Sequence, residues 1–186
     1  MKIVNIFEHS KASLYAVQFE GQDEDELTRL LNRWYDVEEI RNFFKTNQSY
    51  ITNGFFGTLS INEAVEITLK DADYIDETLF SIAAKGKNDK HNTLQTIFKA
   101  LNDNEFKIVE HQKTKLKGQA KKSWLRIYAI RIGPNTFVIS GGGIKLTKEM
   151  KDSSDLKDEL QKLELTKNYL IEIGVFDEND YEYMEI

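Results

Sequence analysis

The stretch Trp124-Leu-Arg-Ile-Tyr-Ala-Ile-Arg-Ile132 is the part of the sequence that decides the fold. It is rich in β-branched and aromatic residues, which pack well on the pleated surface of a sheet. The turn signal Gly133-Pro134-Asn135 follows, and Phe137 to Ser140 is predicted to return as the partner strand. An antiparallel pair of strands is therefore expected at the centre of the structure.

Successive side chains of a strand point to opposite faces of the sheet. This period places Trp124, Arg126 and Tyr128 on one face, and Leu125, Ile127, Ala129 and Arg131 on the other. Arg131 is then a charge at the end of an apolar face, where it requires water, a carboxylate or an anionic ligand. Glu164, on the last predicted helix, is one candidate partner, and an anionic ligand is the alternative.

The residues before this strand are helical in pattern and acidic. Leu27, Leu30, Leu31 and Trp34 recur at helical spacing and form one apolar stripe. Asp36 with Glu39 and Ser60 with Glu63 are capping-box pairs that open further helices. We expect the acidic helices from Asp23 to Ala84, in a helical insertion or subregion over residues 24–86, to pack on one another and on the sheet through their apolar stripes and not to bind nucleic acid. Gly86 is the expected end of the longest helix.

The remaining segments complete an α+β pattern. Strands are expected at the N-terminus and at Phe106 to Val109, and the glycines 141–143 are expected to break the return strand before another at Ile144 to Leu146. Helices are expected at Leu94 to Leu101 and at Ser154 to Leu170. The sequence thus predicts a single α+β domain over residues 1–186, with a small antiparallel sheet packed by helices and an acidic helical N-terminal region.

The charges of the chain are unevenly distributed around a net charge of −6. The stretch from Phe106 to Lys151, here called the basic segment, holds eleven Lys and Arg against two acids, a net +9. The remainder holds fourteen Lys and Arg against twenty-nine acids, a net −15. Such asymmetry indicates an anionic partner for the basic segment, or a basic sheet that neutralises the acidic helices of the same molecule.

Several kinds of chemistry are not expected from this sequence. It has no cysteine, so disulfides and thiolate chemistry are excluded. The spacing of His9, His91 and His111 does not favour a zinc site, and no metal or cofactor is expected. His111 lies at the mouth of the basic segment, either as an acid or base or as a surface histidine in a turn. The N-terminus has no signal-peptide pattern and no apolar run approaches the length of a membrane span, which predicts a cytoplasmic protein.

Taken in order, the pieces after residue 93 resemble the RelE/ParE/HigB superfamily of toxins from type II toxin–antitoxin modules, over about residues 94–170. Members commonly show a short apolar helix, a Lys-x-Leu-x-Gly element, a strand ending in an apolar-Arg-apolar triplet, a return strand, a basic loop and a C-terminal helix. The corresponding pieces are Leu94 to Leu101, Lys115-Leu116-Lys117-Gly118, Tyr128-Ala129-Ile130-Arg131-Ile132, Thr136 to Ser140, Ile144-Lys145-Leu146-Thr147-Lys148 and the last helix.

The resemblance implies mRNA cleavage, on the ribosome or free of it, without a metal. That reaction needs a group to deprotonate the ribose 2′-OH, cations for the phosphate and a donor to the leaving oxygen. Arg131 is implied as the phosphate clamp, with Lys117, Lys145 and Lys148 around it, and Arg131, Lys117 and Lys148 as the catalytic set. The expected RNA-binding residues are Lys115, Lys121, Lys122, Arg126 and Lys145.

The implied partners are RNA or the ribosome and a cognate antitoxin-like protein. Two other functions are compatible with the same residues: a non-catalytic adaptor that binds a protein partner, and a nucleic-acid-binding regulator without nuclease activity. The sequence does not indicate the oligomeric state.

Overall fold

The computed structural model describes residues 1–6, 13–52, 55–86, 88–102, 108–120, 122–147 and 152–180. Within them the strands are β1 (Lys2–Asn5), β2 (Leu14–Gln18), β3 (Lys99–Ala100), β4 (Gln112–Lys117), β5 (Leu125–Gly133) and β6 (Thr136–Ile144). The α-helices are α1 (Glu26–Tyr35), α2 (Val37–Thr46), α3 (Gln48–Thr52), α4 (Ile61–Lys85) and α5 (Ser154–Glu172), and Leu94–Thr96 forms a 3₁₀ turn, η1.

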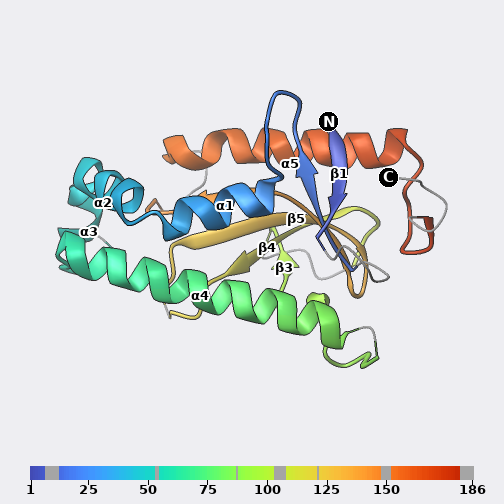
Figure 1. The fold of residues 1–186 in the computed structure, drawn as a ribbon, viewed down its shortest axis with the longest axis horizontal. Helices are drawn as coiled ribbons and strands as arrows, with labels where there is room; N and C mark the ends of the chain where they lie inside the picture. Colours follow the sequence, from blue (N-terminus) through green and yellow to red (C-terminus); the bar gives the residue numbers. More distant parts are fainter. Residues whose placement is uncertain are drawn as a thin grey trace.

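The strands form one six-stranded sheet in the order β1-β2-β6-β5-β4-β3. Neighbouring strands are antiparallel except β2 and β6, which run parallel. Helices α1 and α4 cover one face of the sheet and α5 covers the other (Figure 1). The predicted α+β fold with a mostly antiparallel sheet is confirmed.

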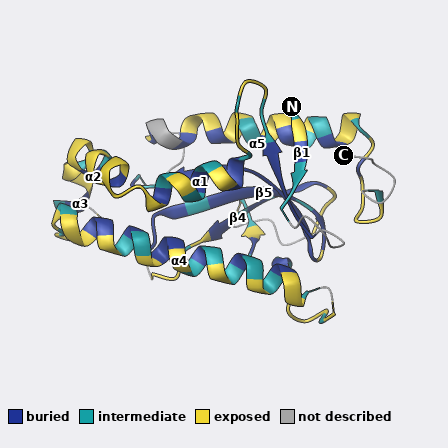
Figure 2. Ribbon diagram, viewed as in Figure 1, coloured by how far each residue is buried: buried dark blue, intermediate teal, exposed yellow. Residues whose placement is uncertain are grey.

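Strand β5 is buried on both faces, which explains its nearly continuous apolar sequence. One face contributes Leu125, Ile127 and Ala129 to a core cluster shared with α1 and α4, and the other contributes Tyr128, Ile130 and Ile132 to a cluster shared with α5. The alternation predicted from the sequence is therefore correct within the strand. Figure 2 shows the resulting pattern, with buried strands between helices whose outer sides are exposed.

Trp124 does not follow the predicted alternation. It was expected on the face of Arg126 and Tyr128, but it precedes β5 and lies in the cluster with α4. Its indole Nε1 donates a hydrogen bond to Thr68 Oγ1 at 2.9 Å, and its ring packs edge-on against Phe44 at 5.2 Å. The residue lies outside the strand geometry, so the period of two does not apply to it.

The acidic helices pack as their apolar stripes predict. Leu27, Leu30 and Trp34 of α1 are buried and Leu31 is partly buried, which stabilises the fold by about 1.5–3 kcal/mol for each large side chain fully removed from water. Asp25 and Asp36 are the N-caps of α1 and α2. Ser60 and Glu63 form the predicted reciprocal capping box at the start of α4, and Gly86 ends that helix. Local chain signals thus define these helices correctly.

The glycine run differs from its prediction. The glycines at positions 141–143 do not break the return strand, because β6 continues through them to Ile144. The register shifts by one residue between the Tyr128–Gly141 and Ala129–Ile139 pairs, which is a β-bulge. Gly141 has a φ of +149°, and glycine allows this backbone conformation at little cost.

Two other local predictions are wrong or untested. The stretch Leu94 to Leu101 was expected to be a helix, but it forms η1 and then the short strand β3. Ile108 and Val109 were expected in a strand and lie in none, while residues 106 and 107 of that prediction fall outside the described residues. An apolar run of this length does not separate a helix from a turn and a strand by periodicity alone.

A group of charged side chains is buried where α1, α5 and the bulge of β6 meet. Glu26 and Glu159 are almost completely buried, and Lys162 Nζ lies 3.0 Å from Glu26 and 2.9 Å from Glu159. Arg29 adds an ion pair to Glu26 at 2.6 Å. Glycine is favoured at position 141 because φ there is +149° and because a Cβ would displace the carboxylate of Glu159. These ion pairs therefore link α1 to α5 beside the bulge of β6.

Stability should depend on pH through Glu159. Burial raises the pKa of this carboxyl group from 4.5, although Lys162 opposes the shift. The protonated form is thus favoured by folding, so the contribution of Glu159 is fully present below about pH 4.5 and is lost as the pH rises through its raised folded-state pKa. We expect the stability of wild type relative to Glu159→Gln to decrease over that window. Urea melts of both proteins at several pH values measure this difference, and a difference that is constant with pH would contradict it.

Candidate functional site

A basic hollow lies where strands β4, β5 and β6 end. Its volume is about 220 Å³, and its lining residues come from the loop before α4, the segment between β4 and β5 and the residues after β6: Phe55, Phe56, Lys117, Gly118, Ala120, Lys122, Ser123, Arg126, Lys145 and Thr147. Four of the cations predicted from the sequence are among them. The hollow is therefore the candidate functional site.

Strand register brings the cations together. Lys117 is the partner of Arg126 across β4 and β5, and Arg126 is the partner of Gly143 across β5 and β6. Lys145 follows β6 directly and is held by a backbone hydrogen bond from its nitrogen to Trp124 O at 2.7 Å. Paired strands lie about 4.8 Å apart. The positive charges consequently concentrate at one end of the sheet.

Arg126 is half-buried at the hollow, whereas Lys117 and Lys122 are exposed. The terminal nitrogen Nη1 of Arg126 donates to the carbonyl oxygens of Ser123 and Leu125 at 2.8 and 2.6 Å. Burial lowers the pKa of its guanidinium, and the negative charge of Asp71 opposes that shift. An arginine stays charged despite such a shift, because its pKa starts so high. The hollow therefore contains a fixed positive charge oriented by two backbone carbonyls.

Asp71 of α4 lies behind the wall of the hollow and is 4% exposed. Its Oδ1 accepts a hydrogen bond from the nitrogen of Ala120 at 3.1 Å, whereas its Oδ2 is buried and has no hydrogen-bond partner among the described residues. Gly118 permits this approach, since a Cβ there would lie 2.5 Å from Oδ2. Asp71 thus anchors the loop after β4 to α4 and places a negative charge near Arg126.

An aromatic wall faces these cations. The Phe55 ring is 71% exposed and packs edge-on against Phe56 at 5.3 Å. Lys122 Nζ lies 4.6 Å from the centre of the Phe55 ring and donates to the Phe55 carbonyl oxygen at 2.6 Å. The hollow therefore combines positive charges with an exposed aromatic ring.

The other predicted site residues fall elsewhere. Lys115, in the middle of β4, donates from Nζ to the carbonyl oxygen of Leu101 at 2.8 Å and does not line the hollow. Lys121 and Lys148 lie outside the described residues.

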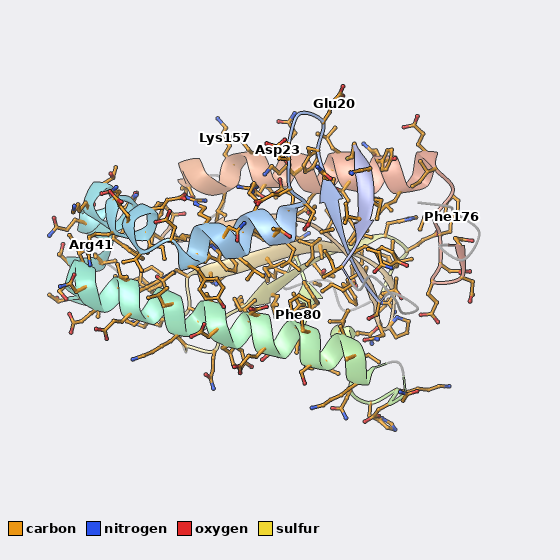
Figure 3. The ribbon with its side chains drawn as sticks, viewed as in Figure 1. Glu20, Asp23, Arg41, Phe80, Lys157 and Phe176 are labelled. Atoms are coloured by element: carbon orange, nitrogen blue, oxygen red, sulfur yellow. The ribbon has the colours of Figure 1, made fainter. Side chains whose placement is uncertain are left out.

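Arg131 lies at the opposite end of β5 from the hollow, and the expectation that Lys117 and Lys145 surround it is wrong. It lies five positions after Arg126, which is roughly 17 Å along a strand. In Figure 3, Arg41 of α2 and Phe176, beyond α5, lie at opposite ends of the molecule. Arg131 lies near Glu178, two residues after Phe176, and the negative charge of Glu178 attracts the guanidinium of Arg131. The register of β4 against β5 places Lys117 opposite Arg126 and Gln112 opposite Arg131.

Arg131 also has different partners from those expected. Its Nε donates to Gln95 Oε1 at 3.0 Å. Burial lowers its pKa, and the negative charge of Glu178 opposes this shift. Glu164, the expected partner, instead forms an ion pair with Lys113. The side chains of Gln95 and Glu178 therefore compensate the positive charge of Arg131, which the sequence analysis predicts at the end of an apolar face.

His111 is neither exposed nor placed in the hollow. It is 4% exposed, and its Nε2 lies 2.6 Å from the carbonyl oxygen of Val175. Its ring also meets Phe176 edge-on at 5.6 Å. The interpretation of His111 as a surface histidine is thus wrong, since the side chain holds the end of α5 against the start of β4.

The sequence reasoning missed Phe55, Phe56 and Asp71. The signal that was present is a pair of aromatic residues between glycines, Gly54-Phe55-Phe56-Gly57, in the loop before α4. Asp71 resembles any other acid of an acidic helix, so only its burial distinguishes it.

Comparisons with protein-family models, with curated proteins and with solved structures found no match to this chain. The RelE-like resemblance therefore stays a prediction. Among the described residues, no three His, Asp or Glu side chains are grouped as a metal site requires. The helices of the described part are too short or too polar to cross a bilayer.

Proposed function

We propose that this protein binds single-stranded RNA through the basic hollow. The observation that carries the proposal is the convergence of Lys117, Lys122, Arg126 and Lys145 on one hollow beside an exposed aromatic ring. Proteins that bind single strands combine a positively charged groove for the backbone with aromatic rings for the bases. The net +9 of the basic segment supports a polyanion as the ligand.

The size of the hollow favours a single strand. A volume of about 220 Å³ accepts a phosphate with part of its sugar, and it is too small for a rigid duplex. A flexible single strand can place one phosphate inside and pass its neighbouring phosphates out of the hollow on either side. The acidic outer faces of α1, α2 and α4 would repel phosphates elsewhere and so direct the strand to this end of the sheet.

Cleavage, which the RelE-like resemblance implies, needs more than these cations. A base must remove the 2′-OH proton and a donor must protonate the leaving oxygen. The hollow offers cations and the hydroxyls of Ser123 and Thr147, its described lining residues include no carboxylate, and Asp71 lies behind its wall. Binding is therefore the function we propose, and shortening of a labelled RNA in the same incubations would add cleavage to it.

Binding should depend strongly on salt, and the dependence should come from the hollow. Each neutralised phosphate of a single strand contributes about 0.7 to the slope of log affinity against log salt. Replacing Lys117 and Lys145 together with glutamine should weaken binding and reduce the slope by about 1.4, since two phosphate contacts are lost. Fluorescence anisotropy with a labelled single-stranded RNA, titrated at several salt concentrations, measures both quantities.

The matched control is the double variant Lys85→Gln and Lys90→Gln. These lysines lie at the C-terminal end of α4 and in the turn after it, whereas the hollow is next to the N-terminal half of that helix. The control should bind with the slope of the wild type. An unchanged slope in the Lys117 and Lys145 variant would remove the hollow from the binding site. No RNA binding by the wild type at about 50 mM salt, where phosphate contacts are strong, would favour the adaptor function instead.

A further inference from the structure

Phe55 is an exposed aromatic ring at the rim of the basic hollow, and its exposed fraction of 71% is the highest among the large apolar side chains described. A phenylalanine in this setting loses the favourable free energy of burial. Single exposed apolar residues are common on protein surfaces. The bracing of Phe55 and its position next to the cations distinguish it from an ordinary surface residue.

The ring is held in place by a chain of edge-to-face aromatic contacts that leads into the core. Phe55 meets Phe56 at 5.3 Å, Phe56 meets Trp124 at 5.2 Å, and Trp124 is anchored by its hydrogen bond to Thr68. Aromatic pairs in this arrangement are favourable beyond the area that they bury. Phe55 is therefore the surface end of a rigid aromatic series.

The loop that carries Phe55 is also tied to its surroundings. The nitrogen of Leu59 donates to the carbonyl oxygen of Ile51 at 2.7 Å, and Thr58 Oγ1 donates to that of Thr52 at 2.9 Å. On the other side, Lys122 donates to the carbonyl oxygen of Phe55 itself. Hydrogen bonds on both sides of the loop hold the Phe55 ring in one position beside the hollow. A ring that is already ordered lowers the entropy cost of binding a ligand there.

Lys122 joins the aromatic ring to the phosphate-binding cations. Its ammonium lies 4.6 Å from the ring centre, a cation–π contact, and the same side chain lines the hollow. A phosphate in the hollow would consequently lie one side chain away from the ring. This spacing suits a nucleotide, in which the base and the phosphate are joined through a sugar.

On the basis of the proposed function, we infer that Phe55 is a stacking platform for an unpaired base next to the phosphate in the hollow. The ligand class is then a single-stranded nucleic acid with accessible bases, and not a simple polyanion or a duplex. Stacking on an aromatic ring is tolerant of sequence, since every base has a π face. The acidic helical region, expected from its sequence only to pack, thus contributes one contact to the ligand through the loop before α4.

The test combines one substitution with one change in the ligand. Phe55→Leu and Phe55→Tyr are compared with the wild type for binding to a single-stranded RNA of about 12 nucleotides, within the range of single-strand sites. The second ligand has the same backbone length without bases in its central positions, and the third is the duplex of the first. Thermal melts are recorded for each variant, since Phe55→Leu loses the edge-to-face contact with Phe56 and the cation–π contact with Lys122 and should lower the melting temperature by about 2–4 °C while leaving the protein folded.

We expect Phe55→Leu to weaken binding of the single strand by roughly 5- to 150-fold, as loss of one base–aromatic stack does. The loss should be equal at every salt concentration, because stacking releases no counterions. The same variant should bind the abasic strand and the duplex as the wild type does, and Phe55→Tyr should keep full affinity. This pattern separates stacking from the phosphate contacts.

Three results would overturn the inference. Equal loss on the single strand and the abasic strand would make Phe55 a structural residue of the hollow. No loss on either strand, with the lysine variant still impaired, would leave the proposed function intact and remove the platform. Failure of the wild type to bind any of the ligands would contradict the proposed function itself, and Phe55 would then be an exposed ring for another class of partner.

Discussion

Gly142→Ala is expected to lower the free energy of unfolding by about 3 kcal/mol or more, at the upper end of overpacking effects. A Cβ at this position would overlap the carbonyl oxygen of Arg126 on β5 and would lie 2.9 Å from Leu30 Cδ1 of α1. The obstacle is backbone, which does not move aside as a flexible side chain does. Strands β5 and β6 would have to separate at the end that carries the hollow. Urea denaturation of both proteins measures the change.

Gly174→Ala is the matched comparison. Gly174 has a φ of +78°, and a Cβ there would meet no atom within 4 Å. Its substitution should therefore cost only the conformational penalty of a left-handed residue, about 1 kcal/mol. Equal stabilities of the two alanine variants would mean that β6 does not approach β5 as closely at Gly142 as the structure shows.

Lys162→Met should destabilise the protein by about 3–5 kcal/mol, the usual effect of removing one partner from a buried ion pair. Its ammonium is 2.9 Å from Glu159 Oε1 and within 3.2 Å of both carboxylate oxygens of Glu26. Without it, two buried carboxylates would face each other beside Arg29. Melting temperature and urea midpoint both report the loss.

Two further variants serve as controls for this result. Lys157→Met, on the exposed side of the same helix (Figure 3), should change stability by less than about 0.5 kcal/mol. Lys162→Met combined with Glu159→Gln should recover part of the loss, because one of the two unpaired charges is gone. A Lys162→Met protein as stable as the Lys157→Met protein would show that the charged group at the bulge does not hold α1 to α5.

Local features of the sequence were sufficient to predict most elements. The stripe of Leu27, Leu30 and Trp34, the capping box at Ser60 and the apolar strand after Trp124 each depend on residues a few positions apart. Such signals act through helix and strand periods and through terminal hydrogen bonds. They failed at Leu94 to Leu101 and at the glycines 141–143, where neighbouring strands decide the conformation of the chain.

The candidate site could be predicted only in part. Charge asymmetry indicated the segment that supplies the four cations lining the hollow, Lys117, Lys122, Arg126 and Lys145. The register of β4 against β5 places Lys117 opposite Arg126 and away from Arg131, and the approach of Phe55 to Lys122 joins residues 67 positions apart. Which charges and rings meet is decided by pairing and packing between distant segments, whose free energies depend on the assembled core and are absent from any short stretch of the chain.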